Sequence, residues 1–261
     1  MNYFDDLEKI RQKKPLIHHI TNFVVMNDSA NITLAIGASP IMAHAEEELE
    51  DLIALANALY INIGTLDKYW IESMFKAGKL AEKYDVPVLI DPVGAGASKL
   101  RTETVNNLLR SFKVDILKGN GGEMLSLAGT KGGIKGVDST REATMDVAFK
   151  LSDMYNTTAI ITGKRDFVSN GRIGASIDNG TEMFQFITGS GCMLGSVVSS
   201  FLSVNNDSFI ASIEGLVTFD IAGELASRKS KGPGSFKQIL FDEIYNFSIE
   251  NYKMAKVNFY D

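Results

Sequence analysis

A glycine-rich turn near the end of the chain carries its only cysteine. The segment Thr188-Gly-Ser-Gly-Cys192 follows a mostly apolar run over 184–187 and precedes a predicted helix over Met193–Val204. Glycines let backbone N–H groups converge without side-chain obstruction, and the positive end of a helix favours anions such as phosphate. The same field is expected to lower the pKa of a thiol there below its usual value of about 8.5. The turn therefore predicts an anion site beside a candidate base or nucleophile, Cys192, with a buried inert thiol as the alternative.

Two apolar runs end at side chains suited to phosphate or metal chemistry. The run at 88–90 leads into Asp91-Pro-Val-Gly-Ala-Gly96, and the run at 158–161 ends at Thr162-Gly163. Ligands of open parallel sheets bind beyond the carboxyl ends of the strands, so a carboxylate and a hydroxyl are well placed there. The alternatives are that Asp91 caps the following turn and that Thr162 is structural.

A third strand end combines a cation, an amide and a carboxylate. The run at 115–117 is followed by Lys118-Gly-Asn-Gly-Gly-Glu123. This mixture suits phosphate together with Mg²⁺, which keeps several waters and needs one or two carboxylates. Asn120 and Glu123 also match a capping box, in which Asn120 begins a helix and Glu123 is its third residue. Both interpretations remain open at this point.

The elements that position these residues follow an alternating pattern. Short apolar runs alternate with amphipathic segments, which is typical of βα units and a mostly parallel sheet, and so predicts an α/β fold. A helix after Gly64 is marked by an apolar stripe from Trp70 to Tyr84, and another is expected to open at Glu46–Glu48. The predicted strands are Leu16–Ile20, Pro40–Ala43, Ala58–Ile63, Pro87–Ile90, Asp115–Leu117 and Thr158–Thr162.

The pattern changes after Gly163. Extended segments at Asp166–Ser169 and Met183–Ile187, with Asn-Gly turns at 170–171 and 179–180, predict antiparallel strands. From Cys192 onward the chain is expected to be almost wholly helical, with breaks at 205–207 and 231–234. No composition shift divides the chain, which predicts one domain over residues 1–261. The glycine- and lysine-rich segment 129–136 is either a cover over a nucleotide or a surface loop.

Composition excludes several classes of protein. The chain has 261 residues, 45% of them hydrophobic, and a net charge of −6, which argues against a nucleic-acid or anionic-membrane surface. A single cysteine excludes an internal disulfide framework, and no apolar run approaches the roughly 20 residues that span a bilayer. The first fourteen residues lack the apolar core of a secretory signal. We therefore expect a cytoplasmic protein.

Standard motifs narrow the chemistry further. The chain has no GxxxxGK[ST] run, and its glycine turn misses the GxGxxG spacing by one residue. His18, His19 and His44 lack the spacings of a zinc site. A cysteine hydrolase that pairs Cys192 with a distant histidine stays open as a second hypothesis. A non-catalytic ligand-binding protein is a third, but it gives no reason for this set of polar strand ends.

Seven motifs in series carry a resemblance across nearly the whole chain. Together they resemble the hydroxyethylthiazole kinase family, which implies a ribokinase-like fold, with a mostly parallel central sheet flanked by helices in three layers. The resemblance also implies transfer of the γ-phosphate of ATP to 4-methyl-5-(2-hydroxyethyl)thiazole in thiamine biosynthesis and salvage, with Mg²⁺ as cofactor, and a homotrimer with interfacial active sites. The motifs are Thr21-Asn22 with Met26–Asn31, Gly37–Met42, Asn62–Thr65, Asp91–Gly96, Lys118–Glu123, Ile161–Gly163 and Thr188–Cys192.

The resemblance also implies roles for individual residues. Cys192 is the candidate base, and the amides at 189–192 receive charge that develops on the transferred group. Substrate contacts are expected from Met42, Gly189, Asn22 and Met26. ATP contacts are expected from Lys118, Thr162 and Asn120, and Mg²⁺ contacts from Asp91 and Glu123.

Two departures from the resemblance concern charge. The wider ribokinase-like group usually has Asp where Cys192 stands, which narrows the match to thiazole kinases but weakens the case for an obligatory base. A kinase of the same fold for a pyrimidine or pyridoxal alcohol, for which Asp would be expected, is the neighbouring alternative. Lys118 stands where Arg is more usual in the family; it keeps the charge and loses the bidentate fork.

Overall fold

A single nine-stranded sheet forms the centre of the computed structural model, which describes residues 5–129 and 144–261. The strand order is β2-β1-β3-β4-β5-β6-β7-β8-β9; the first six strands are parallel and the last three antiparallel. The strands are β1 Leu16–Ile20, β2 Ser39–Met42, β3 Ala58–Asn62, β4 Val88–Asp91, β5 Ile116–Asn120, β6 Thr158–Thr162, β7 Asp166–Ser169, β8 Gly174–Ile177 and β9 Val257–Tyr260.

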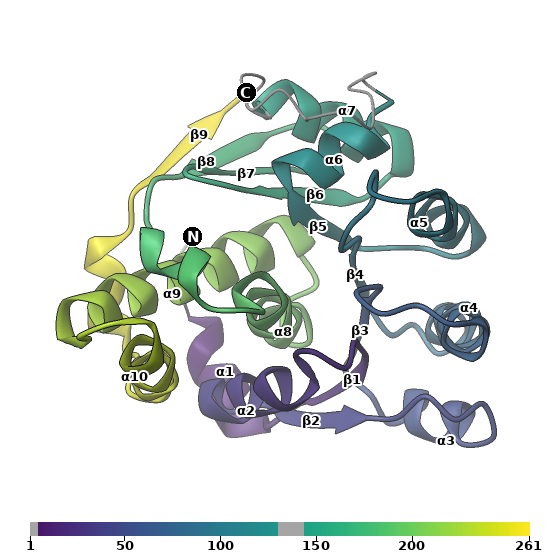
Figure 1. Cartoon of the computed structure of the whole chain (residues 1–261), viewed down its shortest axis with the longest axis horizontal. Coiled ribbons are helices and arrows are strands. Elements are labelled where there is room, and N and C mark those ends of the chain that lie inside the picture. Colours follow the sequence, from purple (N-terminus) through teal and green to yellow (C-terminus); the bar gives the residue numbers. More distant parts are fainter. Residues whose placement is uncertain (1–4, 130–143) are drawn as a thin grey trace.

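Helices cover both faces of this sheet (Figure 1). On one side lie α3 Leu49–Ile53, α4 Lys68–Lys83, α5 Lys99–Ser111, α6 Gly121–Leu127 and α7 Met145–Tyr155. On the other lie α1 Asp6–Lys13, α2 Met26–Ile36, α8 Ser190–Leu202, α9 Ser208–Lys229 and α10 Pro233–Tyr245. Two short 3₁₀ helices, η1 Glu182–Phe186 and η2 Ile249–Met254, complete the described elements. The predicted three-layer α/β fold is confirmed.

The central strands are buried on both faces because each face packs against helices. Alternate residues of β3 belong to two separate cores: Ala58 and Tyr60 face α8 and α9, while Leu59 and Ile61 face α4. Burial of both faces explains why these strands are almost continuously apolar in sequence. Polar side chains are therefore conspicuous where they occur in or directly after these strands.

The register of the parallel strands brings such side chains into one row. Asn62 is paired with Asp91, and the pair Ile90–Leu117 puts Lys118 next to Asp91 on the following strand. In-register neighbours in a parallel sheet point to the same face, and side chains alternate along each strand. Tyr60, Asn62, Asp91 and Lys118 thus all point toward the face that α8 covers.

Most predicted strands are confirmed, with β1 and β6 at the predicted bounds, but the prediction for Met183–Ile187 is wrong. This segment belongs to the 3₁₀ helix η1, which is capped by Thr181, whose hydroxyl accepts the Met183 N–H at 3.3 Å. The Phe184 ring stacks on Phe219 of α9 with ring centroids 4.9 Å apart, so the segment packs on a helix. Strand β8 pairs instead with β9, in a C-terminal region expected to be helical.

Two predicted helix starts are also shifted. Helix α8 begins at Ser190 rather than Met193, because Gly189 adopts a positive φ of 85° and ends the preceding turn. Cys192 consequently lies inside the first turn of the helix. Helix α3 begins at Leu49, after Glu46–Glu48. The proposed cover at 129–136 lies, from residue 130 onward, outside the described residues, and within the described residues no helix has the length and apolarity to span a membrane.

Candidate active site

A buried ion pair forms the centre of the row of polar strand ends. The Lys118 ammonium lies 2.9 Å from Asp91 Oδ2, and both side chains are at most 3% exposed. Burial disfavours the ammonium, but the neighbouring Asp91 carboxylate outweighs it and raises the pKa of Lys118 above its ordinary value. The sequence predicted an ATP contact at Lys118 and a metal ligand at Asp91. The structure joins the two residues to each other, and the alternative of Asp91 as a turn cap is not observed.

The Cys192 thiol lies beside this pair and accepts hydrogen bonds from two amides. Asn62 Nδ2 lies 3.2 Å and Asn22 Nδ2 3.7 Å from Sγ. Burial first, and then the negative charge of Asp91, raise the pKa of the thiol to about 11. The expectation that the helix terminus lowers this pKa is wrong, because desolvation and a nearby carboxylate outweigh the helix field. Cys192 is a neutral thiol near pH 7.

Two residues of this cluster were not among the predicted site residues. Tyr60 places its hydroxyl 3.2 Å from Asp91 Oδ2, and Asn62 uses its amide on both Tyr60 and Cys192. Asn62 Oδ1 in turn accepts the Asn22 amide at 2.7 Å, which fixes the orientation of Asn22. The sequence signal for Asn62 was its position at the end of an apolar strand. Tyr60 had no such signal, since an aromatic residue inside a strand is typical of a core.

The first turn of α8 is open toward the same cluster. Its first intrahelical bond runs from the Met193 N–H to the Gly189 carbonyl at 2.8 Å, so the amides of residues 190–192 precede the intrahelical ladder. A Cβ on Gly189 would lie 2.3 Å from Val25 Cγ1, and one on Gly191 would lie 3.7 Å from Lys118 Nζ. The helix N-terminus and the Lys118 ammonium therefore lie next to each other, which favours an anion between them.

Asn120 and Glu123 form the capping box that the sequence left open. The Glu123 N–H donates to Asn120 Oδ1 at 3.0 Å, and the Asn120 N–H donates to Glu123 Oε2 at 2.8 Å. Glu123 Oε1 also accepts the Gly94 N–H at 2.8 Å. Burial, and next the charge of Asp91, raise the pKa of Glu123 above its ordinary value. A cation near Asp91 and Glu123 would offset the electrostatic repulsion that Asp91 exerts on Glu123.

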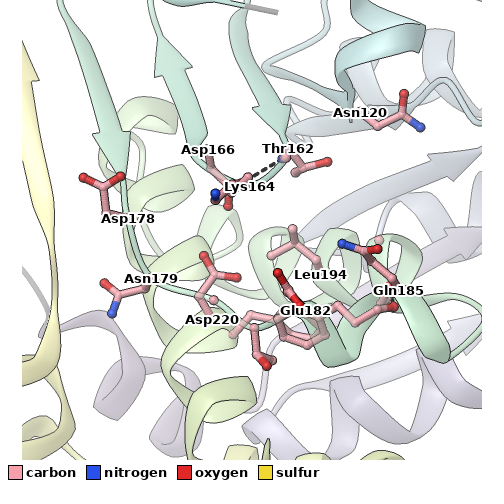
Figure 2. A pocket seen from close by; sticks show the side chains of 17 residues that line it. Asn120, Thr162, Lys164, Asp166, Asp178, Asn179, Glu182, Gln185, Leu194 and Asp220 are labelled. Atoms are coloured by element: carbon pink, nitrogen blue, oxygen red, sulfur yellow. Dashed lines mark hydrogen bonds between the residues drawn. The ribbon is translucent and has the colours of Figure 1, made fainter. Parts of the chain in front are cut away.

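A cavity of about 730 Å³ adjoins this cluster on the side of the antiparallel strands. Asn120, Thr162 and the α8 residues Ser190 and Gly191 line one part of it, and Figure 2 shows Asp220 of α9 facing the strand ends across it. The Thr162 hydroxyl donates to the Gly119 carbonyl at 3.4 Å. The cavity therefore brings two predicted nucleotide contacts to the open end of α8.

The far part of the cavity holds a second pair of buried carboxyls. Asp166 Oδ1 accepts the Gly163 N–H at 2.8 Å, and Asp220 Oδ2 is buried without a hydrogen-bond partner among the described residues. Burial raises the pKa of Asp166 to about 6, and burial together with the Asp166 charge raises that of Asp220 well above its ordinary value. Burial therefore favours the protonated forms of these two carboxyls, whereas Asp91 has an ammonium as its partner.

Comparison with known proteins is unambiguous about the family. A family model described as the hydroxyethylthiazole kinase family matches residues 7–250. The chain belongs to this family. It is 60% identical to the hydroxyethylthiazole kinase of Caldivirga maquilingensis, over 97% of this chain and 95% of that protein. It is 49% identical to the hydroxyethylthiazole kinase of Archaeoglobus fulgidus, over 94% of this chain and 91% of that protein.

Solved structures agree with this family assignment. The hydroxyethylthiazole kinase of Pyrococcus horikoshii OT3 has a TM-score of 0.92 at 43% identity, covering 99% of both chains. A Staphylococcus aureus pyridoxal kinase solved with AMP-PCP and pyridoxal has a TM-score of 0.64 at 15% identity, covering 94% of this chain and 98% of that chain, which shows a shared fold alone. The predicted family, fold and kinase activity are confirmed.

Two residues that the family resemblance placed on the substrate lie at the end of β2 and at the start of α2. Met42 ends β2 at the edge of the sheet and is paired with His19, and Met26 begins α2, where it packs against the core on the α4 side. Neither has a hydrogen bond to the Cys192 cluster among the described residues. Gly189 and Asn22, by contrast, lie beside Cys192 in sequence or in space.

The histidines that a cysteine hydrolase would need are engaged elsewhere. His18 Nε2 bonds the Ala43 carbonyl at 2.8 Å, and His44 stacks on Trp70 with ring centroids 3.7 Å apart. His19 Nε2 lies 3.4 Å from the Thr33 hydroxyl, and burial lowers the pKa of His19 to about 3. A neutral thiol with amide partners does not form the thiolate–imidazolium pair of such enzymes. The geometry therefore gives no support to that hypothesis.

Proposed function

We propose that the protein transfers the γ-phosphate of ATP to the hydroxyethyl group of 4-methyl-5-(2-hydroxyethyl)thiazole, a step of thiamine biosynthesis and salvage. The observation that carries this proposal is the junction of the Asp91–Lys118 pair, Cys192 and the open first turn of α8 beside a cavity of about 730 Å³. Phosphoryl transfer depends mainly on positioning and on neutralisation of negative charge. This junction offers both.

The cavity is proposed to hold ATP with its phosphates toward α8. Thr162 and Asn120 line the cavity, and Lys118 lies behind Gly191 at the same end. The amides of residues 189–192 would then receive the negative charge that develops on the transferred group. The other end carries the Asp166 and Asp220 carboxyls beside Lys164, whereas the α8 end combines open amides with Lys118, which supports this orientation of the nucleotide.

Asp91 and Glu123 fit a magnesium ion. Both supply oxygen donors, and their mutual electrostatic repulsion would be relieved by a cation. Asp91 Oδ2 is used by Tyr60 and Lys118, whereas Oδ1 has no hydrogen-bond partner within the described residues. Glu123, tied to two backbone amides, suits contact through a bound water. Bound there, Mg²⁺ would neutralise phosphate charge.

Cys192 is proposed to contact the substrate hydroxyl as a neutral thiol. With a pKa of about 11, the thiol is already protonated near pH 7 and is not available as a base. A loose phosphoryl-transfer transition state needs little base assistance. Asn22 and Gly189 would line the same end of the alcohol site. Met42 and Met26 are proposed as more distant parts of its apolar wall.

The wider setting of the enzyme is also a proposal. We infer one kinase domain over residues 1–261, a cytoplasmic location, and a homotrimer whose interfaces complete the active sites. Phe23 and Val24, each 62% exposed directly after Asn22, support an interface at the alcohol end. Light scattering of the purified protein tests the trimer, and a monomeric mass would contradict it.

A product assay tests the proposed function. The purified protein is incubated with ATP, Mg²⁺ and the thiazole alcohol, and ADP and thiazole phosphate are separated chromatographically. We expect both products in equal amounts, with neither formed when the alcohol is omitted. A folded protein that makes neither would refute the function, and faster turnover of pyridoxal or a pyrimidine alcohol would favour the neighbouring kinase class.

A further inference from the structure

Tyr60 joins three groups of the candidate active site through one hydroxyl. The oxygen lies 3.2 Å from Asp91 Oδ2, 3.1 Å from the Cys192 carbonyl oxygen and 3.0 Å from Asn62 Nδ2. The side chain is fully buried, and a Cβ on Gly195 would lie 2.3 Å from this oxygen. Helix α8 thus packs directly on the hydroxyl, at a distance that only glycine permits.

The bonding pattern assigns the proton of this hydroxyl. The Asn62 amide donates to the Tyr60 oxygen, whereas Asp91 Oδ2 and the Cys192 carbonyl can only accept. The Cys192 carbonyl already accepts the Ser196 hydroxyl at 3.3 Å. A hydrogen bond to a carboxylate is stronger than one to a neutral carbonyl, so the proton belongs on the Asp91 side. A phenol keeps its proton at neutral pH, so the Tyr60 hydroxyl remains a donor to Asp91.

This bond determines which oxygen of Asp91 faces the reaction. Tyr60 and Lys118 both approach Oδ2, which directs the less engaged Oδ1 away from them. Without the hydroxyl, Lys118 alone would leave the carboxylate free to rotate. Misplacement of a catalytic group by about 1 Å can cost a large factor in rate even when substrate binding is unchanged.

We propose that Tyr60 is a positioning residue of this kinase, whose hydroxyl orients the Asp91 carboxylate and fixes the first turn of α8 against it. The inference rests on the proposed function, because it assigns a task to Asp91 in phosphoryl transfer. Tyr60 itself touches neither substrate. Its effect is therefore expected in turnover rather than in substrate affinity.

The test is Tyr60→Phe, which keeps the ring and removes the hydroxyl. We expect kcat to fall about tenfold, as for loss of a hydrogen bond to a charged group, with KM for the alcohol within about twofold of wild type. Tyr252→Phe is the matched control, because it removes another buried phenol hydroxyl, bonded to Thr218 at 2.8 Å. It is expected to leave kcat within about twofold of wild type.

A double-mutant cycle distinguishes positioning of Asp91 from a purely structural role of Tyr60. In an Asp91→Asn background, Tyr60→Phe is expected to lower kcat by less than about twofold, because the group it positions is gone. Wild-type kcat in Tyr60→Phe, an equal loss in Tyr252→Phe, or a full tenfold loss in the Asp91→Asn background would each overturn the inference. An inactive wild-type protein would instead refute the proposed function.

Discussion

Two buried aspartates on neighbouring parts of the same sheet are neutralised in different ways. Asp91, at the end of β4, has the Lys118 ammonium at 2.9 Å and the Tyr60 hydroxyl at 3.2 Å. Asp166, at the start of β7, faces the carboxyl of Asp220, and burial raises the pKa of Asp166 to about 6. One carboxylate is matched by a cation, and burial favours the protonated form of the other.

The difference indicates which end of the site can handle phosphate. A carboxylate paired with an ammonium leaves the local charge near zero, and the open amides of α8 then make that end attractive to an anion. The other end carries the Asp166 and Asp220 carboxyls together with Lys164, and the carboxyls become more negative as the pH rises. The chain thus separates an anion-binding end from an acidic end within one continuous region.

The largest effect is expected when the Lys118 ammonium is removed from the Asp91–Lys118 end. Lys118→Met leaves Asp91 buried and unpaired, which should lower the free energy of unfolding by about 3 to 5 kcal/mol and abolish turnover. Chemical denaturation and the kinase assay measure the two losses. Lys118→Arg, which keeps the charge, should retain most of the stability.

The double variant Lys118→Met with Asp91→Asn separates charge from packing. Because it buries no unpaired charge, it should recover most of the lost stability while remaining inactive. If it is no more stable than Lys118→Met alone, the Lys118 side chain acts through packing and the electrostatic account of this end is wrong.

At the acidic end, Asp166→Asn should alter how stability depends on pH. The folded state holds the Asp166 proton up to about pH 6, whereas the unfolded chain releases it near the ordinary value of 3.8. Folded protein therefore binds more protons in this window, and its stability falls as the pH rises through it. Relative to wild type, Asp166→Asn should gain about 2 kcal/mol between pH 4 and pH 8.

Urea denaturation at both pH values checks this gain. The control is Asp51→Asn, an exposed position on α3, which should stay within about 0.5 kcal/mol of wild type throughout. A stability difference between Asp166→Asn and wild type that is the same at pH 4 and pH 8 would show that the pKa of Asp166 is not raised in the folded protein.

The smallest effect is expected at Cys192. Cys192→Ala removes a thiol contact to the alcohol, so kcat should fall about fivefold while ATP affinity changes little. Because the pKa of the thiol is about 11, the pH profile of kcat should show no Cys192 ionisation between pH 6 and 9. Steady-state kinetics across this range test both points. If kcat of the wild type changes with an ionisation near neutral pH, and this change is lost in Cys192→Ala, the thiol is the base.

The anion-binding end was largely predictable from sequence, and the acidic end was not. Asp91 and Lys118 interrupt apolar runs at strand ends, and parallel strands bring such ends together. Asp220 interrupts the mostly apolar helix α9, and nothing local shows that it meets Asp166. Which partner neutralises a buried carboxyl depends on contacts between elements distant in sequence.

The errors in the fold have the same origin. No signal in the sequence marked Tyr60, because its role depends on Gly195 of α8 packing against it. The 183–187 segment has the composition of a strand, but β9 takes the available edge of β8, and Phe184 packs on α9 instead. The pKa of Cys192 was expected to fall because the helix field is visible in sequence, whereas burial beside Asp91 is visible only in the structure.

The most direct test of the account follows the phosphorus itself. Phosphorus NMR of the wild-type protein with ATP, Mg²⁺ and the thiazole alcohol should show the γ-phosphate signal replaced by a phosphomonoester and ADP, without orthophosphate. Asp91→Asn, checked for folding by circular dichroism, should form phosphomonoester at only a small, still measurable fraction of the wild-type rate, and Asp51→Asn should behave as wild type. Phosphomonoester formed by Asp91→Asn at the wild-type rate would contradict the claim that phosphoryl transfer takes place at the Asp91–Lys118 end.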